Sequence, residues 1–315
     1  MPERGKTVLV TGSTGRLGRA LSKRLLEEGY TVRGLVRTKE GVSRLVAGTV
    51  PFQGDMFDSE SLRKACNGVE IVFHTAGILS QSRFDSKTIL GTNVTGTMNL
   101  ADAMKEAGVQ KMIYASSANV YGRRRRGPIK EEDEPRPTDT YGLSKAMAEK
   151  KLEESTITSA MLRLASIYGP GFESSFFKVF EVIRMGKAYV IGNGKNHLAM
   201  VHVDDAVESF LLAARKRISG SRAYNIGDGR EYTQEYLLGL GADLLGVPRP
   251  ERHISTVLAK IVAKASGLER DEMRFMTSDR ILDIGRARKE LGFAPRESVE
   301  SSAGKMLSDF TYGKR

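Results

Sequence analysis

Two residues near the middle of the chain, Tyr141 and Lys145, are spaced for acid–base chemistry. Because they stand four positions apart, they share one face if the segment is helical. A phenol with a pKa of about 10 is a poor base at neutral pH, and a nearby ammonium group lowers that pKa by stabilising the phenolate. The pair therefore predicts a site that exchanges a proton with the hydroxyl or carbonyl oxygen of a substrate.

A glycine-rich turn near the N-terminus indicates a cofactor for the same site. Its glycines follow the apolar run 7–11 directly, and leucines at helical spacing come next. Such a turn lets the backbone approach a pyrophosphate closely, while the N-terminus of the following helix faces the phosphate charge. We therefore expect a dinucleotide here. The turn residues expected to bind it are Gly12, Thr14, Gly15, Arg16, Leu17 and Gly18.

The end of the second strand, at 31–37, bears on which dinucleotide binds. NAD requires a carboxylate there for the adenosine ribose hydroxyls, and no acid occurs before Glu40. Arg37 could instead pair with a 2′-phosphate, with Arg16 as a second contact. We favour NADP(H). NAD(H) stays possible, because Arg37 could also be an ordinary surface arginine.

Alternating strands and helices must position these residues. The sequence predicts buried strands at 7–11, 31–37, 50–54, 71–75, 111–116 and 160–165, with helical stretches between them, the longest at 90–107. Strands separated by helices pair in parallel through right-handed crossovers. We expect an α/β fold with a Rossmann-type doubly wound parallel sheet. Residues 1–170 form its dinucleotide-binding domain, to which segments around 200–228 return, and 171–315 form mainly a smaller C-terminal substrate lobe.

Several candidate site residues stand where predicted strands end, at the edge where a doubly wound sheet binds ligands. After the third strand, Asp55 could accept a hydrogen bond from adenine while Met56 packs on the ring, although a plain turn carboxylate is the alternative. The small residues after the fourth strand leave room for the cofactor, and His74 beside them is expected to be structural. Those small residues are Thr75, Ala76 and Gly77.

The motifs together resemble the extended short-chain dehydrogenase/reductase family. They are TGSTGRLG, GDM, HTAG, NVTGTMNL, YASSANVYG, YGLSK and LRLASIYGPG, in this order over most of the chain. The resemblance implies that Tyr141 is the general acid/base, that Lys145 binds the nicotinamide ribose, and that Ser117, rather than Ser116, bonds the reacting oxygen. It implies that Asn93 holds the helix and water network behind Lys145. It also adds Ala165 and Ile167 to the cofactor contacts.

The resemblance leaves the reaction open between hydride transfer to a small-molecule carbonyl and a nucleotide-sugar epimerase or dehydratase. Sugar-nucleotide members often carry a proline and an asparagine in the segment that here reads Arg163 to Ser166, and an Arg-Asp pair where this chain has Leu198 to Met200. These departures remove polar groups that could serve a nucleotide-sugar and so favour the oxidoreductase. The tail at 275–295 looks closer to the 3β-hydroxysteroid dehydrogenase and dihydroflavonol reductase branches. A cofactor-sensing regulator without turnover is a third hypothesis. Relatives pair through helices like those expected at 90–107 and 138–155, which implies apolar outer faces and a homodimer.

Composition excludes other classes. The net charge is +11, yet the run Arg123 to Arg126 is followed by acids at 131–134, and no nucleic-acid module accompanies it. We interpret that run as a solvated basic loop, with an anion-attracting rim near the active site as the alternative.

One cysteine and four scattered histidines argue against disulfides and a metal site. No apolar run could span a bilayer and no secretory signal opens the chain, so we expect a cytoplasmic protein without membrane insertion. The apolar spacing at 255–267 predicts a core-facing helix, with a wall for an apolar substrate or a weak membrane contact as alternatives.

Overall fold

Seven parallel strands form the central sheet of the computed structural model, which describes residues 5–79, 84–265 and 270–312. The strands are β1 (Thr7–Thr11), β2 (Thr31–Val36), β3 (Val50–Gln53), β4 (Ile71–His74), β5 (Lys111–Ser117), β7 (Thr158–Leu164) and β11 (Ser221–Ile226), in the spatial order β11-β7-β5-β4-β1-β2-β3. The order reverses between β1 and β4, which opens a crevice at the carboxyl ends of these strands. The predicted doubly wound parallel sheet is confirmed.

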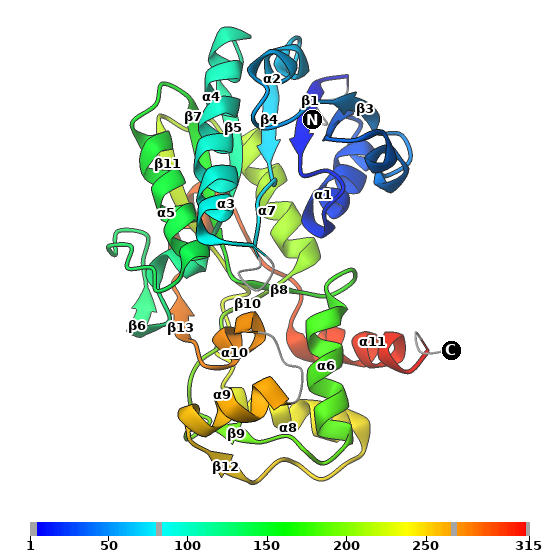
Figure 1. Cartoon of the computed structure of the whole chain (residues 1–315), viewed down its shortest axis with the longest axis vertical. Coiled ribbons are helices and arrows are strands. Elements are labelled where there is room, and N and C mark those ends of the chain that lie inside the picture. The colour runs from blue at the N-terminus through cyan, green and yellow to red at the C-terminus, as the bar shows by residue number, and fades with distance from the viewer. Residues whose placement is uncertain (1–4, 80–83, 266–269, 313–315) are drawn as a thin grey trace.

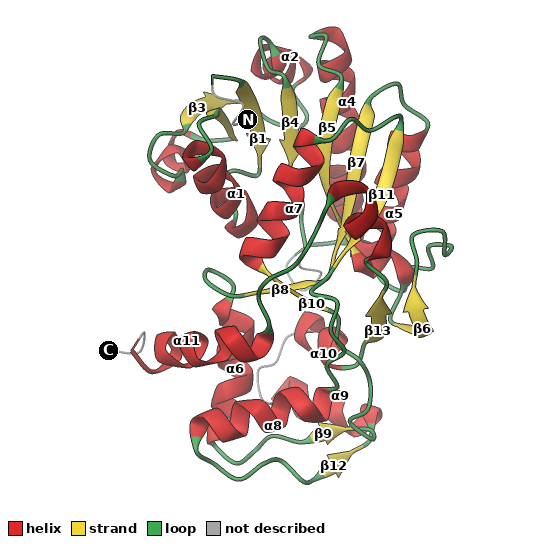
Figure 2. Ribbon diagram, turned by 180° about the vertical axis from the view of Figure 1, so that it is seen from behind, coloured by secondary structure: helices red, strands yellow, loops and turns green. Residues whose placement is uncertain are grey.

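Helices cover both faces of the sheet (Figures 1 and 2). The helices α1 (Arg16–Glu27) and α7 (Val203–Arg215) lie on one face, and α2 (Ser59–Cys66), α4 (Gly96–Glu106) and α5 (Thr140–Glu153) lie on the other. Strands enclosed in this way must be apolar on both sides. Val8, Leu9 and Val10 of β1 are accordingly all fully buried.

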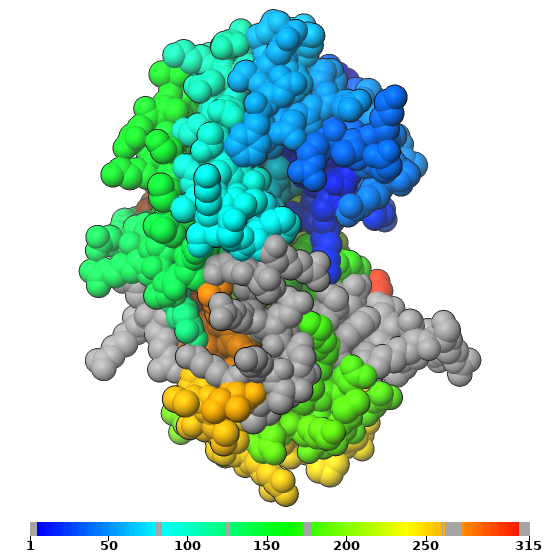
Figure 3. Space-filling model, viewed as in Figure 1, coloured from blue at the N-terminus to red at the C-terminus, as the bar shows by residue number. Residues whose placement is uncertain are grey.

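The C-terminal half adds a lobe below the carboxyl edge of the sheet, in yellow, orange and part of the green in Figure 3. Its helices are α6 (Glu173–Arg184), α8 (Gln234–Leu245), α9 (Thr256–Ala265), α10 (Arg270–Met276) and α11 (Val299–Tyr312). Short parallel strand pairs tie it together: β8 (Ser166–Tyr168) with β10 (Met200–His202), and β9 (Val190–Ile191) with β12 (His253–Ile254). The lobe therefore lies where the crevice of the sheet opens.

Two local predictions differ from the structure. The stretch 90–107 is helical but not one regular helix, because α3 (Ser86–Leu90) passes into α4 through a π-helical turn, η2 (Gly91–Thr95). The basic run was predicted as a loop, which is wrong for its backbone: Arg124–Ile129 forms β6, paired in parallel with β13 (Asp279–Leu282). A partner strand so distant in the chain leaves no signal in the local sequence. Both changes occur close to the site.

The helix expected at 255–267 exists as α9, but the prediction that it faces the core is wrong for most of its described apolar side chains. Val257, Leu258 and Ile261 are 71%, 46% and 64% exposed, and only Ala259 is buried. Helical spacing of apolar residues shows that a helix has an apolar face, and it does not identify what covers that face. Within the described ranges, no helix combines the length and the apolar character needed to span a bilayer.

Candidate active site

The turn between β1 and α1 has the backbone geometry of a pyrophosphate cradle. Gly12 adopts a φ of +70°, and a Cβ there would lie 2.6 Å from the backbone nitrogen of Ala76. A Cβ on Gly18 would lie 2.1 Å from the carbonyl oxygen of Gly12. Gly15 caps α1 without a side chain, so the first amides of the helix remain available to an anion. Only glycines fit this turn, which therefore suits a dinucleotide.

Three arginines gather around the outer end of this turn. Arg37 follows β2 directly and is exposed, as is Arg16 at the start of α1. The sequence analysis missed Arg44, which closes the 3-10 helix η1 (Lys39–Arg44) and whose Nη2 donates to the carbonyl of Thr14 over 3.4 Å. Glu40, the first acid after β2, is exposed, and hydrogen bonds to backbone and to Thr38 lower its pKa. The end of β2 is thus predominantly basic.

The residues after β3 serve local structure. Asp55 Oδ1 accepts a hydrogen bond of 2.9 Å from the amide of Phe57. This carboxylate therefore stabilises the turn after β3, which is the alternative to its predicted contact with adenine. Met56 is half-buried and packs against Gly96 of α4, where a Cβ would come within 3.2 Å of its Cβ. Asn99 also donates to the carbonyl of Met56 over 2.9 Å. Their contacts to adenine remain a prediction.

A buried histidine fixes the loop after β4. His74 Nδ1 lies 2.7 Å from Thr11 Oγ1, and its Nε2 lies 2.8 Å from Thr97 Oγ1. Burial lowers the pKa of His74 to about 3, so the ring is neutral. Thr75 Oγ1 donates to the carbonyl of Thr11 over 2.8 Å, and the amide of Ala76 donates to Thr11 Oγ1. His74 is therefore structural, and it holds Thr75 and Ala76 against the glycine turn.

The acid–base pair lies on α5, whose N-terminus is capped by Asp139 accepting a 2.7 Å bond from the Gly142 amide. Tyr141 is half-buried, and Lys145 one turn later is 3% exposed. Lys145 Nζ donates to the carbonyl of Ala115 over 2.8 Å and lies 5.9 Å from the centre of the Tyr141 ring. Ser117, at the end of β5, lies close enough to Tyr141 for its side chain to oppose the rise of the Tyr141 pKa. The structure thus brings Ser117, Tyr141 and Lys145 together.

The pKa values of the pair differ from the sequence-based expectation. Burial raises the pKa of Tyr141 to about 12, and the side chain of Ser117 only partly opposes it. Burial also lowers the pKa of Lys145 to about 7, opposed by the charge of Glu149. The expectation that Lys145 lowers the pKa of Tyr141 is not met, because desolvation of the phenolate is the larger effect. Tyr141 is therefore protonated at neutral pH.

Asn93 supports this group from the π-helical turn η2. Its Oδ1 accepts from the amide of Ile78 over 2.8 Å, while its Nδ2 donates to the Ile78 carbonyl and to Ser144 Oγ over 3.0 and 2.9 Å. A Cβ on Gly77 would lie 3.1 Å from Asn93 Oδ1 and 3.4 Å from Lys145 Nζ. Asn93 therefore joins the loop after β4 to α5, and Gly77 leaves the space beside Lys145 open.

Sequence reasoning missed an ion pair beneath the site. Glu149, one turn beyond Lys145, is 2% exposed, and Arg163 of β7 is 4% exposed. Their closest atoms, Arg163 Nη2 and Glu149 Oε2, are 2.7 Å apart. Ser116 also donates to Glu149, so it points away from Tyr141 and leaves Ser117 as the serine that faces the reacting groups. The spacing of Tyr141, Lys145 and Glu149 on one helix face was the available signal.

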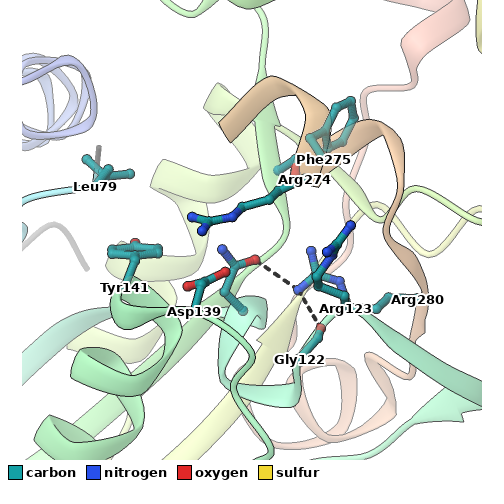
Figure 4. Close-up of a pocket in the computed structure, with 10 residues that line it drawn as sticks. Leu79, Gly122, Arg123, Asp139, Tyr141, Arg274, Phe275 and Arg280 are labelled. Carbon is teal, nitrogen blue, oxygen red and sulfur yellow. Dashed lines mark hydrogen bonds between the residues drawn. The ribbon is translucent and has the colours of Figure 1, made fainter. Parts of the chain in front are cut away.

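The far side of Tyr141 opens into a pocket of about 170 Å³. Figure 4 shows Tyr141 and Asp139 on one wall, Arg123 and Arg280 on the other, and Arg274 extending from α10 between them. Ser166 also lines it, whereas the predicted cofactor contacts flank this serine: Ala165 is buried and Ile167 is half-buried. No group of three His, Cys, Asp or Glu side chains suited to a metal ion occurs among the residues that the structure describes.

Known proteins resemble this chain in sequence and in fold. The chain is 28% identical to a 3-beta-hydroxysteroid dehydrogenase of Mycolicibacterium neoaurum, covering 96% of this chain and 91% of the relative. It is also 28% identical to a farnesyl-dihydroquinoline-oxide ketoreductase of Stigmatella aurantiaca, covering 91% of both chains. The fold matches that of a Thermotoga maritima UDP-glucose 4-epimerase with UDP-glucose, with a TM-score of 0.80, 25% identity, and coverage of 98% and 100%.

The profile of the NAD dependent epimerase/dehydratase family matches residues 8–227, from the first strand of the sheet to the segment after its last. The match includes the glycine cradle, Asn93, Ser117, Tyr141 and Lys145. Together with these relatives, it shows that the chain is a nicotinamide-dependent enzyme, an oxidoreductase or an epimerase/dehydratase. The protein belongs to the NAD dependent epimerase/dehydratase family and has the extended short-chain dehydrogenase/reductase fold.

Proposed function

We propose that the protein is an NADPH-dependent reductase of a small-molecule carbonyl compound, with Tyr141 as its proton donor. The observation that carries this proposal is the group formed by Tyr141, Ser117 and Lys145 at the carboxyl edge of the sheet. A pKa of about 12 keeps Tyr141 protonated at neutral pH, as a donor to a carbonyl oxygen must be. Relatives named as a ketoreductase and as a 2-alkyl-3-oxoalkanoate reductase support this direction.

The cradle residues fit a dinucleotide, because Gly12 and Gly18 allow a tight turn in which a Cβ would collide with the backbone, and Gly15 leaves the N-terminus of α1 without a side chain. When bound, the nicotinamide supplies the hydride that reduces the carbonyl carbon. Ser117 would hold the carbonyl oxygen beside the Tyr141 hydroxyl, which donates its proton to that oxygen. Lys145 would then stabilise the phenolate and bind the nicotinamide ribose, and Asn93 keeps Lys145 accessible by holding the loop at Ile78.

The preference for NADPH is supported by the basic end of β2. Arg37, Arg16 and Arg44 surround the place that the adenosine ribose occupies after a glycine cradle, with no carboxylate at the strand end itself. A guanidinium group binds a phosphate through charge-assisted hydrogen bonds, whereas the ribose hydroxyls of NAD call for an acceptor. Arg44 reaches the turn through Thr14, so we assign it to the 2′-phosphate together with Arg37.

A nucleotide-sugar epimerase or dehydratase is the second candidate. The fold match to a UDP-glucose 4-epimerase favours it, as do the arginines in the pocket, which a diphosphate could engage. Against it, the segment Arg163 to Ser166 lacks the proline and the asparagine of many sugar-nucleotide enzymes. Their Arg-Asp pair is also missing from the segment Leu198 to Met200, in which Leu198 is buried. The reductase therefore remains the preferred function.

We also propose that the enzyme is a cytoplasmic homodimer. Leu143 and Met147 of α5 are 42% and 39% exposed and follow each other on one helix face, which a second copy would cover. The outer face of α4 does not match the apolar character expected of it, because Asp102 and Lys105 are exposed there. The single cysteine, Cys66, is a buried free thiol, which suits a reducing compartment.

Calorimetric titration with NADPH and NADH tests the cofactor assignment. We expect NADPH to bind more tightly, and Arg37→Ala and Arg44→Ala each to weaken NADPH binding about 10- to 100-fold, the equivalent of about 1.5 to 3 kcal/mol for charge-assisted bonds, with NADH binding unchanged. Arg63→Ala, an exposed arginine on α2, is the matched control. Equal or tighter NADH binding that Arg37→Ala does not alter would sink the assignment and favour the epimerase or dehydratase.

A further inference from the structure

The pocket beside Tyr141 carries an excess of positive charge. Among its lining residues, Arg123, Arg274 and Arg280 are opposed by one carboxylate, that of Asp139. Asp139 also accepts a hydrogen bond from the Gly142 amide, so part of its charge already serves the cap of α5. A cavity this small concentrates the field of its charged walls.

Arg280 is the most unusual of the three, because it is almost entirely buried. It is 8% exposed, and its Nη1 donates to the carbonyls of Ala118 and Gly122 and to Asn119 Oδ1 at 2.9 to 3.2 Å. All three acceptors are neutral. Its Nε is buried and has no hydrogen-bond partner. Asp139 acts on this guanidinium electrostatically, but no carboxylate forms an ion pair with it among the described residues. A buried charge without a direct ion-pair partner is unfavourable, so structure alone does not account for this position.

Arg123 shows the same feature on the adjoining backbone. Its Nη2 donates to Thr277 Oγ1, yet its Nε is buried and lacks a hydrogen-bond partner. Within the described residues, the ion pairs include neither Arg123 nor Arg280. Burial lowers the pKa of Arg280 to about 10. The charge of Asp139 opposes this shift, and the repulsion from Arg123 adds to it. Arg280 therefore still carries its charge at neutral pH.

We propose that the carbonyl substrate carries one compact anionic group, a carboxylate or a monophosphate ester, that binds between Arg123 and Arg280. This inference rests on the proposed reductase function and adds the substrate class to it. Such an anion supplies the direct ion-pair partner that neither arginine has among the described residues, and it balances the excess of positive charge that Asp139 only partly offsets. Tyr141 on the facing wall then meets the carbonyl end of the same molecule, while Leu79 and Phe275 contact its apolar part.

The test compares matched substrates that differ in one charge. Initial rates of NADPH oxidation are measured with the isomeric carboxybenzaldehydes against their methyl esters, and with glyceraldehyde 3-phosphate against glyceraldehyde. We expect kcat/KM to be about tenfold or more higher for the preferred anion than for its neutral partner, as charge-assisted bonds imply. The carboxylate and phosphate pairs distinguish the two sources of negative charge.

Arg123→Gln is the informative variant, because Arg123 has fewer structural bonds than Arg280. It should remove the preference for the anion, mainly by raising KM for the anion far more than KM for the neutral partner. Arg123→Lys should restore part of the preference. Arg249→Gln, which removes an exposed arginine paired with Asp243 on α8, is the matched control and should behave as wild type.

The outcomes separate this inference from the proposed function. Equal turnover of the neutral and anionic partners, or an unchanged preference in Arg123→Gln, would overturn the anion site. Neither result would bear on the reductase activity itself. If no carbonyl compound is reduced, calorimetry of the same pairs with the NADP⁺-bound protein decides. If the anion binds more tightly than its neutral partner and Arg123→Gln abolishes this difference, the anion site is supported and the reductase function is rejected. If neither compound binds at millimolar concentration, the anion site is overturned.

Discussion

Replacing Glu149 by glutamine removes one buried charge and almost no volume. The Nε of Arg163 donates to both carboxylate oxygens over 3.1 Å, and its Nη2 donates to one of them over 2.7 Å. Ser116 donates to the same group. Glutamine keeps one acceptor oxygen, but its amide nitrogen is a donor that would face the donors of Arg163. The variant therefore leaves a buried guanidinium without its counter-charge.

The structure indicates how large the loss should be. The bonds that Arg163 retains run to the Tyr121 hydroxyl and the Glu131 carbonyl, both neutral acceptors. Breaking one partner of a buried ion pair costs about 3–5 kcal/mol, a large part of the roughly 5–15 kcal/mol by which domains are stable. We expect Glu149→Gln to lower the free energy of unfolding by that amount.

Glu149→Gln should also change the pH dependence of activity. The charge of Glu149 opposes the burial that lowers the pKa of Lys145 to about 7. Without that charge the pKa of Lys145 falls further, so Lys145 keeps its proton only at lower pH. We expect the loss of activity on the alkaline side of the pH profile to begin at lower pH than in the wild type.

Urea unfolding measures the first effect, and kcat/KM as a function of pH measures the second. In the double variant Glu149→Gln/Arg163→Met both charges are gone, so most of the lost stability should return. Glu60→Gln, which breaks an exposed pair with Lys64, is the control and should leave the free energy of unfolding nearly unchanged. A loss of under about 1 kcal/mol in Glu149→Gln, or a double variant less stable than the single one, would refute the reasoning.

Tyr141→Phe should bind NADPH normally and lose activity by orders of magnitude; turnover near the wild-type rate would remove Tyr141 from the proton transfer. Gly18→Ala places a Cβ 2.1 Å from the carbonyl oxygen of Gly12, so calorimetry should show dinucleotide binding abolished, and unchanged affinity would contradict the cradle. Leu143→Glu should shift sedimentation at micromolar concentration from dimer to monomer, and a monomeric wild type would reject the interface. Between pH 6.5 and about 3, His74 takes up a proton in the unfolded chain but stays neutral in the folded protein. The free energy of unfolding should therefore fall by about 1.4 kcal/mol for each pH unit in this range because of His74. In His74→Gln the free energy of unfolding should depend less steeply on pH.

The nucleotide half of the site could be predicted because its signals are local. The glycine turn occupies one β-turn-α unit, and Tyr141 and Lys145 lie one helical turn apart. In a parallel sheet the carboxyl ends of the strands meet at one edge, so a residue's position after a strand also indicates where it lies. Ser117 could be placed near Tyr141 on that basis. Local sequence therefore predicted both the cradle and the reacting group.

The electrostatics of this half could not be predicted, because they depend on burial. Spacing alone suggested that Lys145 lowers the pKa of Tyr141. In the structure Lys145 is buried, Tyr141 is half-buried, and the Lys145 ammonium donates to the carbonyl of Ala115. Desolvation is a property of everything packed around a group. The partner of Arg163 was missed for the same reason, since a strand and a helix must pack before Glu149 meets it.

The substrate half depends on residues that lie far apart in the chain. Arg123 precedes β6 and Arg280 lies in β13, and the pairing of these two strands brings the arginines to one wall. Neither arginine stands at the end of a strand of the central sheet, so the rule that located the cofactor residues does not apply to them. The run that contains Arg123 suggested a solvated loop because its charge is visible in the sequence and its partner strand is not. If the anion site exists, substrate specificity is set by this strand pair, and substitutions there should change substrate preference while leaving NADPH binding intact.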